Sequence, residues 1–237
     1  MEREVTSQPK EEYVSKKIKG LNFATDIRPG KLMVRCSNVA KAYGKNRVFT
    51  NLDFELRGQE KLWLFGPNGA GKSTLVKMIM GEELTSSGEV KIGDNVKLGY
   101  FAQVQHMDKE GTDNRNLQEI FTASTNCFFY DAKGYLSKFL FNKDDIAKRI
   151  WQLSPGERAR FAFAIFAHKD YDLLILDEPD NHLDIETKEV IEDSLRKYQG
   201  TLLLVSHDRY FVESVGVNKV LNLKAGALSY FENESLE

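Results

Sequence analysis

The sequence predicts an α/β protein with a mainly parallel central sheet, on three observations. Short apolar runs with strand character at 61–65, 173–176 and 201–205 alternate with segments of helical periodicity. The last two runs are apolar throughout and end in polar or acidic residues, as buried parallel strands do. A glycine-rich segment joins the first run to a helical one. Since ligand chemistry gathers at the carboxyl ends of parallel strands, we expect the functional residues there.

Composition and charge narrow the class of protein. The 237 residues can form one sizeable core, and 33 basic against 35 acidic residues argue against a protein that coats nucleic acid. Cys36 and Cys127 are too far apart for a disulfide framework or a metal knuckle, so we expect a reduced, cytoplasmic setting. Segment 1–20 lacks a secretory apolar core, and the apolar run 161–167 is far shorter than the ~20 residues of a membrane span. We expect no direct membrane insertion.

The glycine-rich segment 66–74 fits the phosphate-binding pattern G-x-x-x-x-G-K-[ST]. Its glycines let successive N–H groups turn inward around phosphate oxygens, and the next helix directs its positive end at the same anion. Lys72 supplies a cation for the β- and γ-phosphates, and Ser73 is placed to ligate Mg²⁺. A glycine-rich turn before an ordinary helix is the alternative, which the strand and helix flanks disfavour. We predict that a nucleoside triphosphate is bound by Gly66, Pro67, Asn68, Gly69, Ala70, Gly71, Lys72, Ser73 and Thr74.

The segment before this loop divides into two parts. Residues 1–30 form a charged N-terminal extension, which we interpret as a solvated linker. From residue 31 the pattern becomes β, with strands predicted at 32–36 and 48–56. Tyr43 lies between these two strands near a turn, where its ring is as suited to packing as to stacking on a purine base.

The middle of the chain reads as strands followed by a helical region. Segments 88–93 and 96–101 have strand character, and Gln103 follows at once. Apolar residues at spacings of three and four between 117 and 151 then predict amphipathic helices. The aromatic side chains of this region form either a docking face or, as we favour, the core of a small helical subdomain: Phe128, Phe129, Tyr130, Tyr135, Phe139 and Phe141.

Residues 153–157 have the pattern of a helix start. Ser154 and Glu157 have the spacing of a capping box, and Pro155 falls on the first helical position. The free N–H groups and the hydroxyl at such a positive helix end make a second anion site.

The acidic residues that follow the second apolar run are the candidate catalytic groups. Asp177 is placed to hold the Mg²⁺ shell, and Glu178 is placed to accept a proton from an attacking water. His207 follows the third run and is placed to reach a γ-phosphate, although a lone histidine is more often structural. After an amphipathic helix at 186–198, the chain ends in a predicted hairpin at 219–231.

The order of these motifs resembles an ATP-binding-cassette (ABC) ATPase domain over about residues 31–231, with a helical subdomain at about 105–168. Three finer segments resemble the ABC-F subgroup, whose members act on ribosomes: 99–103, 178–184 and 206–211. The resemblance implies a P-loop NTPase fold with a mixed or parallel sheet, an N-terminal antiparallel β-subdomain and the helical subdomain.

The resemblance also implies roles for residues. Two cassettes close head to tail around two ATP molecules, so that the phosphate loop of one meets Ser154, Gly156 and Glu157 of the other. Tyr43 is expected to stack on adenine, and Gln103 to sense Mg²⁺ and the attacking water. Lys72, Gln103, Glu178 and His207 are the expected catalytic set, with Ser73, Gln103 and Asp177 at the metal.

Three departures from the family pattern stand out. Pro155 replaces a glycine, which the capping pattern tolerates. Asp180 replaces a threonine and adds a carboxylate near the γ-phosphate, where it is expected to alter the rate of hydrolysis. ABC-F proteins carry two cassettes joined by a long helical linker, and this chain has one, so residues 1–30 resemble the end of such a linker and the cassette resembles the second of the pair.

Three functions are open at this point. The first is an ATP-hydrolysing ABC-F cassette whose closure acts on the ribosome, in translation or in protection against ribosome-targeting antibiotics. The second is the ATP-binding subunit of a membrane transporter, with the helical subdomain docking on a separate transmembrane subunit. The third is a nucleotide-dependent assembly module with little turnover, suggested by Asp180 and the single cassette.

Overall fold

The computed structural model describes residues 27–101, 113–181, 183–224 and 227–230. The strands are β1 (Leu32–Tyr43), β2 (Asn46–Arg57), β3 (Lys61–Phe65), β4 (Ser87–Ile92), β5 (Leu98–Tyr100), β6 (Leu173–Asp177), β7 (Thr201–Val205), β8 (Lys219–Asn222) and β9 (Ala227–Tyr230). The helices are α1 (Lys72–Ile79), α2 (Leu117–Thr125), α3 (Phe129–Lys138), α4 (Lys143–Ala147), α5 (Pro155–His168), α6 (Ile185–Lys197) and α7 (Arg209–Val215), with a 3₁₀ turn at Ile150–Gln152.

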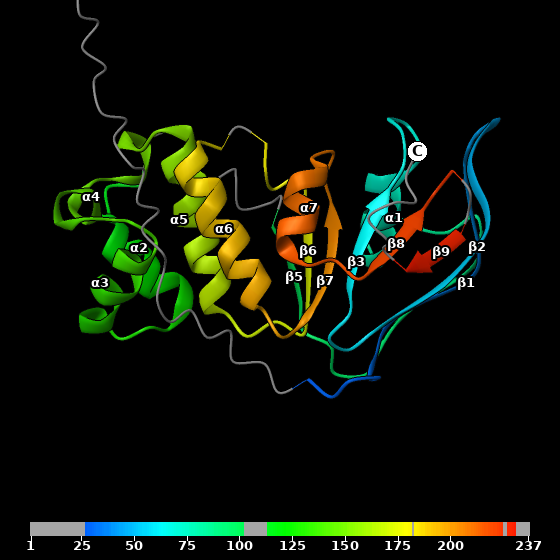
Figure 1. Ribbon diagram of the computed structural model, residues 1–237, viewed down its shortest axis with the longest axis horizontal. Coiled ribbons are helices and arrows are strands. Elements are labelled where there is room, and N and C mark those ends of the chain that lie inside the picture. The colour runs from blue at the N-terminus through cyan, green and yellow to red at the C-terminus, as the bar shows by residue number, and fades with distance from the viewer. Residues whose placement is uncertain (1–26, 102–112, 182, 225–226, 231–237) are drawn as a thin grey trace, which may run out of the picture.

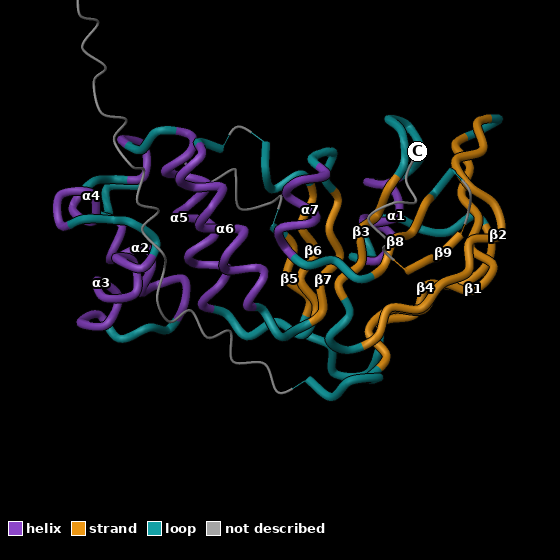
Figure 2. Tube along the Cα trace, in the orientation of Figure 1, coloured by secondary structure: helices purple, strands orange, loops and turns teal. Residues whose placement is uncertain are grey.

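Two sheets organise the molecule (Figure 1). The larger has the order β5-β6-β7-β3-β8-β9, in which the first five strands run parallel and β9 is antiparallel to β8. The smaller is antiparallel, in the order β2-β1-β4. Figure 2 shows the antiparallel strands at one end of the molecule, α2, α3 and α4 at the other, and the larger sheet between them. The predicted α/β fold with a mixed sheet, an antiparallel β-subdomain and a helical part is confirmed.

The larger sheet separates two hydrophobic cores. Successive side chains of a strand point to opposite faces, and along β6 they alternate between the cores. Leu174 and Leu176 pack into the core that contains α2 to α7, whereas Leu173 and Ile175 pack into the core that contains α1 and the antiparallel sheet. The apolar run at 173–176 is therefore explained by burial on both faces.

The aromatic residues of the helical region divide into two groups. Phe139 and Phe141 are buried, and Tyr135 packs partly buried against Phe121 and His168. Phe128, Phe129 and Tyr130 are instead 80%, 47% and 91% exposed. The prediction of a shared core is thus right for the later three and wrong for the earlier three. The first helical residue of α3 is Phe129, so three consecutive aromatics at its start cannot share one inward face.

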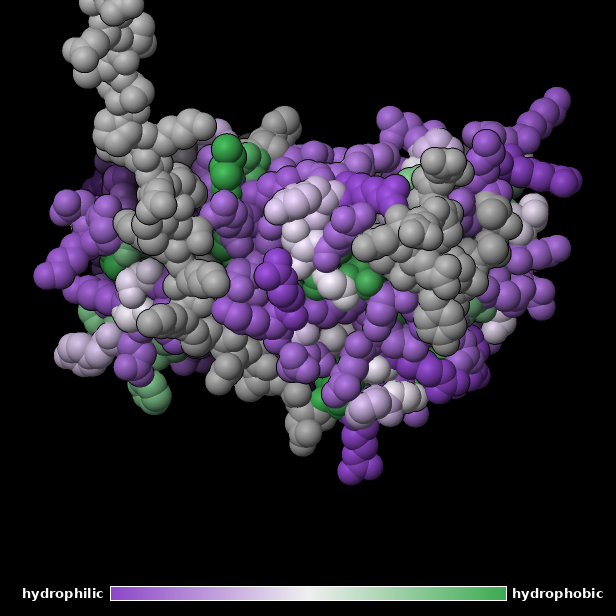
Figure 3. All heavy atoms as spheres, in the orientation of Figure 1, coloured by the Kyte–Doolittle hydropathy of each residue, from purple (hydrophilic) through white to green (hydrophobic). Residues whose placement is uncertain are grey.

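The surface in the view of Figure 3 is mostly hydrophilic, with hydrophobic residues in small scattered groups. Within the described residues, no helix is both long and apolar enough to cross a membrane.

Candidate functional site

The loop between β3 and α1 is built for close approach to an anion. Gly69 and Gly71 have φ angles of 81° and 96°, in the left-handed region that L side chains rarely adopt. A Cβ on Gly71 would also lie 2.3 Å from Cγ1 of Val48, so the loop packs directly on β2. The structure therefore requires glycine at 71 for both its backbone angle and its packing.

Lys72 is turned back onto this loop. Its side chain is buried, and Nζ donates hydrogen bonds to the carbonyl oxygens of Gly66 at 2.7 Å and Pro67 at 3.2 Å. The ammonium group is thus held at the mouth of the loop by acceptors that phosphate oxygens can replace. Ser73 is exposed at the start of α1.

A groove of about 650 Å³ opens beside the loop. It is lined by Arg47, Val48, Phe49, Thr50, Pro67, Asn68, Gly69, Ala70, Leu223 and Lys224. Tyr43 is not among these residues. Its ring is half exposed at the end of β1, and Nζ of Lys41 lies 4.8 Å from the ring centroid. Stacking of Tyr43 on a base stays a prediction.

Asp177 ends β6, and its carboxyl interacts electrostatically with the ammonium group of Lys72. Burial and the neighbouring charge of Glu178 raise the pKa of its carboxyl above the usual value, while the Lys72 ammonium acts in the opposite direction. The hydroxyl of Tyr100, at the end of β5, lies 3.4 Å from Oδ2 of Asp177. Burial and Asp177 raise the pKa of Tyr100 to about 12, so this phenol stays protonated and can donate.

Glu178 is held in an unusual backbone conformation. Its φ is 50°, which is rare for a side chain larger than asparagine, and its N–H donates to the carbonyl oxygen of Val205 at 2.8 Å. Asn181 Nδ2 donates to Oε2 at 2.5 Å, and Nε2 of His207 lies 3.5 Å from Oε1. The predicted acid and the predicted histidine are therefore side by side, with both side chains substantially open to solvent.

Asp180 is partly buried beneath this pair. Its Oδ1 is inaccessible and has no hydrogen-bond partner among the described residues, while its carboxyl bonds the side chain of Ser206. Burial raises the pKa of Asp180, and the Ser206 bond opposes this only in part. A carboxylate with an unpartnered buried oxygen is costly, so we expect this departure from the family pattern to lower the stability of the fold.

The capping box at the start of α5 is confirmed. Ser154 Oγ accepts from the N–H of Glu157 at 3.1 Å, Glu157 Oε2 accepts from the N–H of Ser154 at 2.7 Å, and Pro155 is the first helical residue. Gly156 is buried and lies close to Asp184. A Cβ added to Gly156 would lie only 2.3 Å from Oδ2 of Asp184. A side chain at 156 would therefore displace the Asp184 carboxylate, whose Oδ1 caps α6 by accepting from the N–H of Thr187.

These contacts place two anion-binding features on one edge of the larger sheet. The strands β3, β6 and β7 run parallel, so the phosphate loop, Glu178 and His207 all follow carboxyl ends at that edge. Asp184 lies in the segment after β6, and its contact with Gly156 brings the first turn of α5 to the same edge. The structure thus brings the phosphate loop, Glu178, His207 and the first turn of α5 to one edge of the larger sheet. Gln103 lies outside the described residues.

Sequence reasoning missed two polar partners in this site. Tyr100 and Asn181 orient Asp177 and Glu178, respectively. Asn181 sits three residues after Glu178, a spacing that signals a turn contact, whereas nothing in the sequence pairs Tyr100 with Asp177. No group of three or more His, Cys, Asp or Glu side chains forms a metal cluster within the described part of the chain.

Comparison with known proteins agrees with this geometry. The family profile described as ABC transporter matches residues 49–181. The chain belongs to the ATP-binding-cassette family. It is 37% identical over 216 residues to ABC transporter F family member 2 of Arabidopsis thaliana, covering 88% of this chain and 32% of that protein. It is 36% identical over 202 residues to the ribosome protection protein VmlR of Bacillus subtilis (strain 168), covering 83% of this chain and 35% of that protein. These relatives identify the cassette as ABC-F in type.

A solved structure shows the same fold. A dimeric ATP-binding cassette in a post-hydrolysis state, bound to ADP and Pi, superposes with a TM-score of 0.67 at 22% identity, covering 85% of this chain and all of that one. The cassette described here spans about a third of the length of the curated relatives it matches.

Proposed function

We propose that this ABC-F cassette hydrolyses ATP. The observation that carries the proposal is the pairing of Glu178 with His207, 3.5 Å apart, at the strand ends that flank the phosphate loop. Glu178 orients and deprotonates an attacking water, which displaces ADP in line from the γ-phosphorus. Lys72 and His207 stabilise the negative charge on the transferring phosphoryl group.

The oxygen ligands near the loop suit Mg²⁺, which prefers one or two carboxylates together with substrate phosphates. We expect Ser73, Gln103 and Asp177 to hold the ion. The hydroxyl and carboxylate oxygens of this set fit a hard cation, and the exposed position of Ser73 leaves room for one. The ion would neutralise charge on the β- and γ-phosphates.

The complete site needs a second cassette. The first turn of α5 offers Ser154, Gly156 and Glu157 at a positive helix end, and one copy supplies only one half of each cleft. A monomer therefore binds ATP but turns it over slowly. Phosphate release measured against protein concentration tests this, because the specific activity should rise with concentration. A constant specific activity well below the dimerisation constant contradicts the shared site.

ATP-driven closure of the pair acts on the ribosome, in translation or in protection against ribosome-targeting antibiotics. Support comes from the ABC-F relatives, among them a protein named for ribosome protection. Sedimentation of the Glu178→Gln variant with ATP tests this proposal, with Lys72→Ala, which binds nucleotide more weakly, as the control. Absence of Glu178→Gln from ribosomal fractions contradicts it.

One observation favours a second candidate, the ATP-binding subunit of a transporter. Phe128, Phe129 and Tyr130 expose aromatic surface on the helical part, where a transmembrane subunit would dock. Co-purification with membranes that is lost in Phe128→Ser/Tyr130→Ser supports this candidate, and recovery of the wild-type protein free of membranes argues against it. The third candidate, an assembly module, is removed by ATPase activity that Lys72→Ala abolishes.

A further inference from the structure

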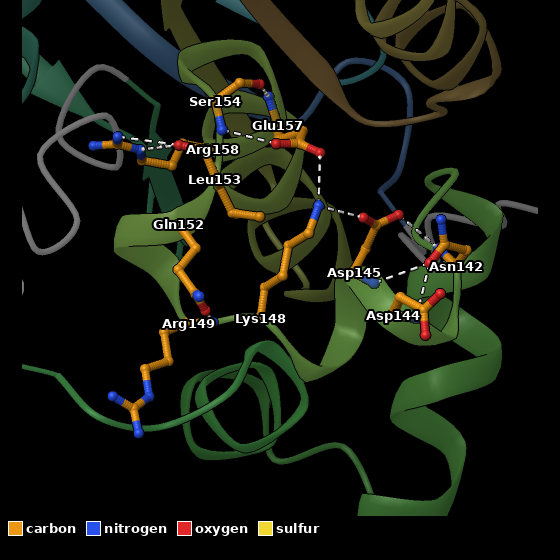
Figure 4. Close-up of polar contacts among 10 residues, drawn as sticks. All are labelled: Asn142, Asp144, Asp145, Lys148, Arg149, Gln152, Leu153, Ser154, Glu157 and Arg158. Atoms are coloured by element: carbon orange, nitrogen blue, oxygen red, sulfur yellow. Dashed lines mark hydrogen bonds and ion pairs between the residues drawn. The ribbon is translucent and has the colours of Figure 1, made fainter.

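The side chain of Lys148 links the helical part of the molecule to the first turn of α5 (Figure 4). Its Nζ lies 2.6 Å from Oδ1 of Asp145 in α4 and 3.4 Å from Oε1 of Glu157 in α5. The two carboxylates belong to different helices and point toward the same ammonium group.

Both carboxylates are the acidic members of capping boxes. Asp145 Oδ2 accepts from the N–H of Asn142 at the start of α4, as Glu157 accepts from Ser154 at the start of α5. The carbonyl oxygen of Lys148 also accepts from the N–H of Leu117, the first residue of α2. Lys148 thus joins the starts of three helices, and two of these contacts go through the groups that cap them.

The cluster is charged at neutral pH. The hydrogen bond to Asp145 raises the pKa of Lys148. Burial acts to raise the pKa of Asp145 and Glu157, but Lys148 and the capping amides bring both below their usual values. Arg160 contributes a second positive charge on the Asp145 side. Glu157 lies in the first turn of α5, which Ser154 caps. Among the described residues, its ion-pair partner is Lys148.

A negative charge at this turn opposes the function proposed for it. The positive end of α5 attracts phosphate, and an uncompensated Glu157 in its first turn would repel the same phosphate. We propose that Lys148 is a positioning residue for the second cassette's ATP: it fixes Glu157 in the capping geometry and offsets its charge, so that the first turn of α5 accepts the triphosphate. This inference rests on the proposed function of a shared ATP site.

The test compares three variants of the protein with the wild type. Lys148→Met removes the cation, and Lys148→Met/Glu157→Gln removes it with the charge it offsets, since glutamine can also fill the capping position. Lys143→Met makes the same charge change at an exposed residue of α4. Fluorescent ATP binding is measured on dilute monomer, and dimerisation is measured by sedimentation velocity with AMP-PNP and Mg²⁺ over a series of salt concentrations.

We expect Lys148→Met to bind the fluorescent nucleotide as the wild type does, because the phosphate loop is unchanged. The dissociation constant of its dimer should rise about fivefold at low salt, and less at high salt. The double variant should recover most of this loss, and Lys143→Met should show none. Recovery separates offset of charge from a purely structural role, because a structural tether stays broken in the double variant.

Three results overturn the inference. If Lys148→Met dimerises as the wild type does, Lys148 has no positioning role, while the shared site stands. If the double variant is as impaired as Lys148→Met, the charge argument is wrong. A wild type that does not dimerise with AMP-PNP refutes the proposed shared site itself, and the role of Lys148 falls with it.

Discussion

Substitution of Ser154 separates the capping role of this residue from its role toward phosphate. Its Oγ accepts one hydrogen bond, from the N–H of Glu157, and its hydroxyl faces the start of α5. Loss of an N-cap costs about 1 kcal/mol, which for a domain of this size lowers Tm by roughly 2–4 °C. Ser154→Ala should show this fall. Aspartate caps as well as serine does, so Ser154→Asp should keep Tm within about 1 °C of the wild type.

In ATP-driven dimerisation the order of the two variants should be reversed, because Ser154→Asp should be the more impaired. A carboxylate at 154 would lie about 4 Å from a phosphate oxygen, where like charges repel by about 1 kcal/mol in water and about 4 kcal/mol near a protein surface. A dimer has two such sites, so the total repulsion is about 2–8 kcal/mol. The dissociation constant of the dimer should therefore rise by about thirtyfold or more.

The assay pairs differential scanning fluorimetry with light scattering of size-separated protein in AMP-PNP and Mg²⁺. Ser154→Thr, which keeps both the hydroxyl and the cap, is the matched control and should dimerise. If Ser154→Asp dimerises at the wild-type concentration, the first turn of α5 does not receive a phosphate, and the shared site is refuted.

The other predictions concern the phosphate loop and the acidic residues. Lys72→Ala should weaken ATP binding about tenfold to a hundredfold by fluorescence titration, because it removes a charge-assisted bond to phosphate, whereas Lys77→Ala on the exposed side of α1 should bind normally. Glu178→Gln should lower kcat about 10²- to 10⁴-fold while keeping nucleotide affinity, measured by phosphate release; loss of affinity instead would assign Glu178 to binding. Because the pKa of Asp180 is raised, the folded state keeps a proton that the unfolded chain has lost. The Asp180 carboxyl therefore favours folding at low pH. This contribution to stability is lost as the pH rises above 3.8, the usual pKa of an aspartate, and through the raised pKa of the folded state. The Tm of Asp180→Asn relative to the wild type should therefore increase from pH 4.5 to pH 8, and Asp94→Asn, at an exposed aspartate after β4, is the control for the same substitution.

Local signals in the sequence were sufficient for much of the fold. The strand predicted at 61–65 matches β3. Consecutive apolar residues just before a phosphate loop are typical of a strand that is buried on both faces. The capping box at 154–157 was visible because its spacing is a property of one helix turn. Each of these features depends on residues within a few positions of one another.

Features that depend on tertiary placement were not predictable. Tyr100 reaches Asp177 only because β5 and β6 pair in the sheet, and Gly156 meets the Asp184 carboxylate only because the segment after β6 returns to the start of α5. The spacing of aromatic residues indicated a helix but not which turn would begin it. For this reason Phe128 and Tyr130 were wrongly placed inside.

The alternation of side chains along β6 gives the molecule two interiors that can be perturbed one at a time. Leu174 and Ile175 are covalent neighbours, yet a cavity made at one opens toward α5 and a cavity made at the other opens toward α1. Each interior supports a different half of the nucleotide chemistry. Truncations of these two adjacent residues, whose side chains are isomers of equal size, would therefore report separately on the layer that presents the phosphate loop and on the layer that carries the turn offered to a second cassette.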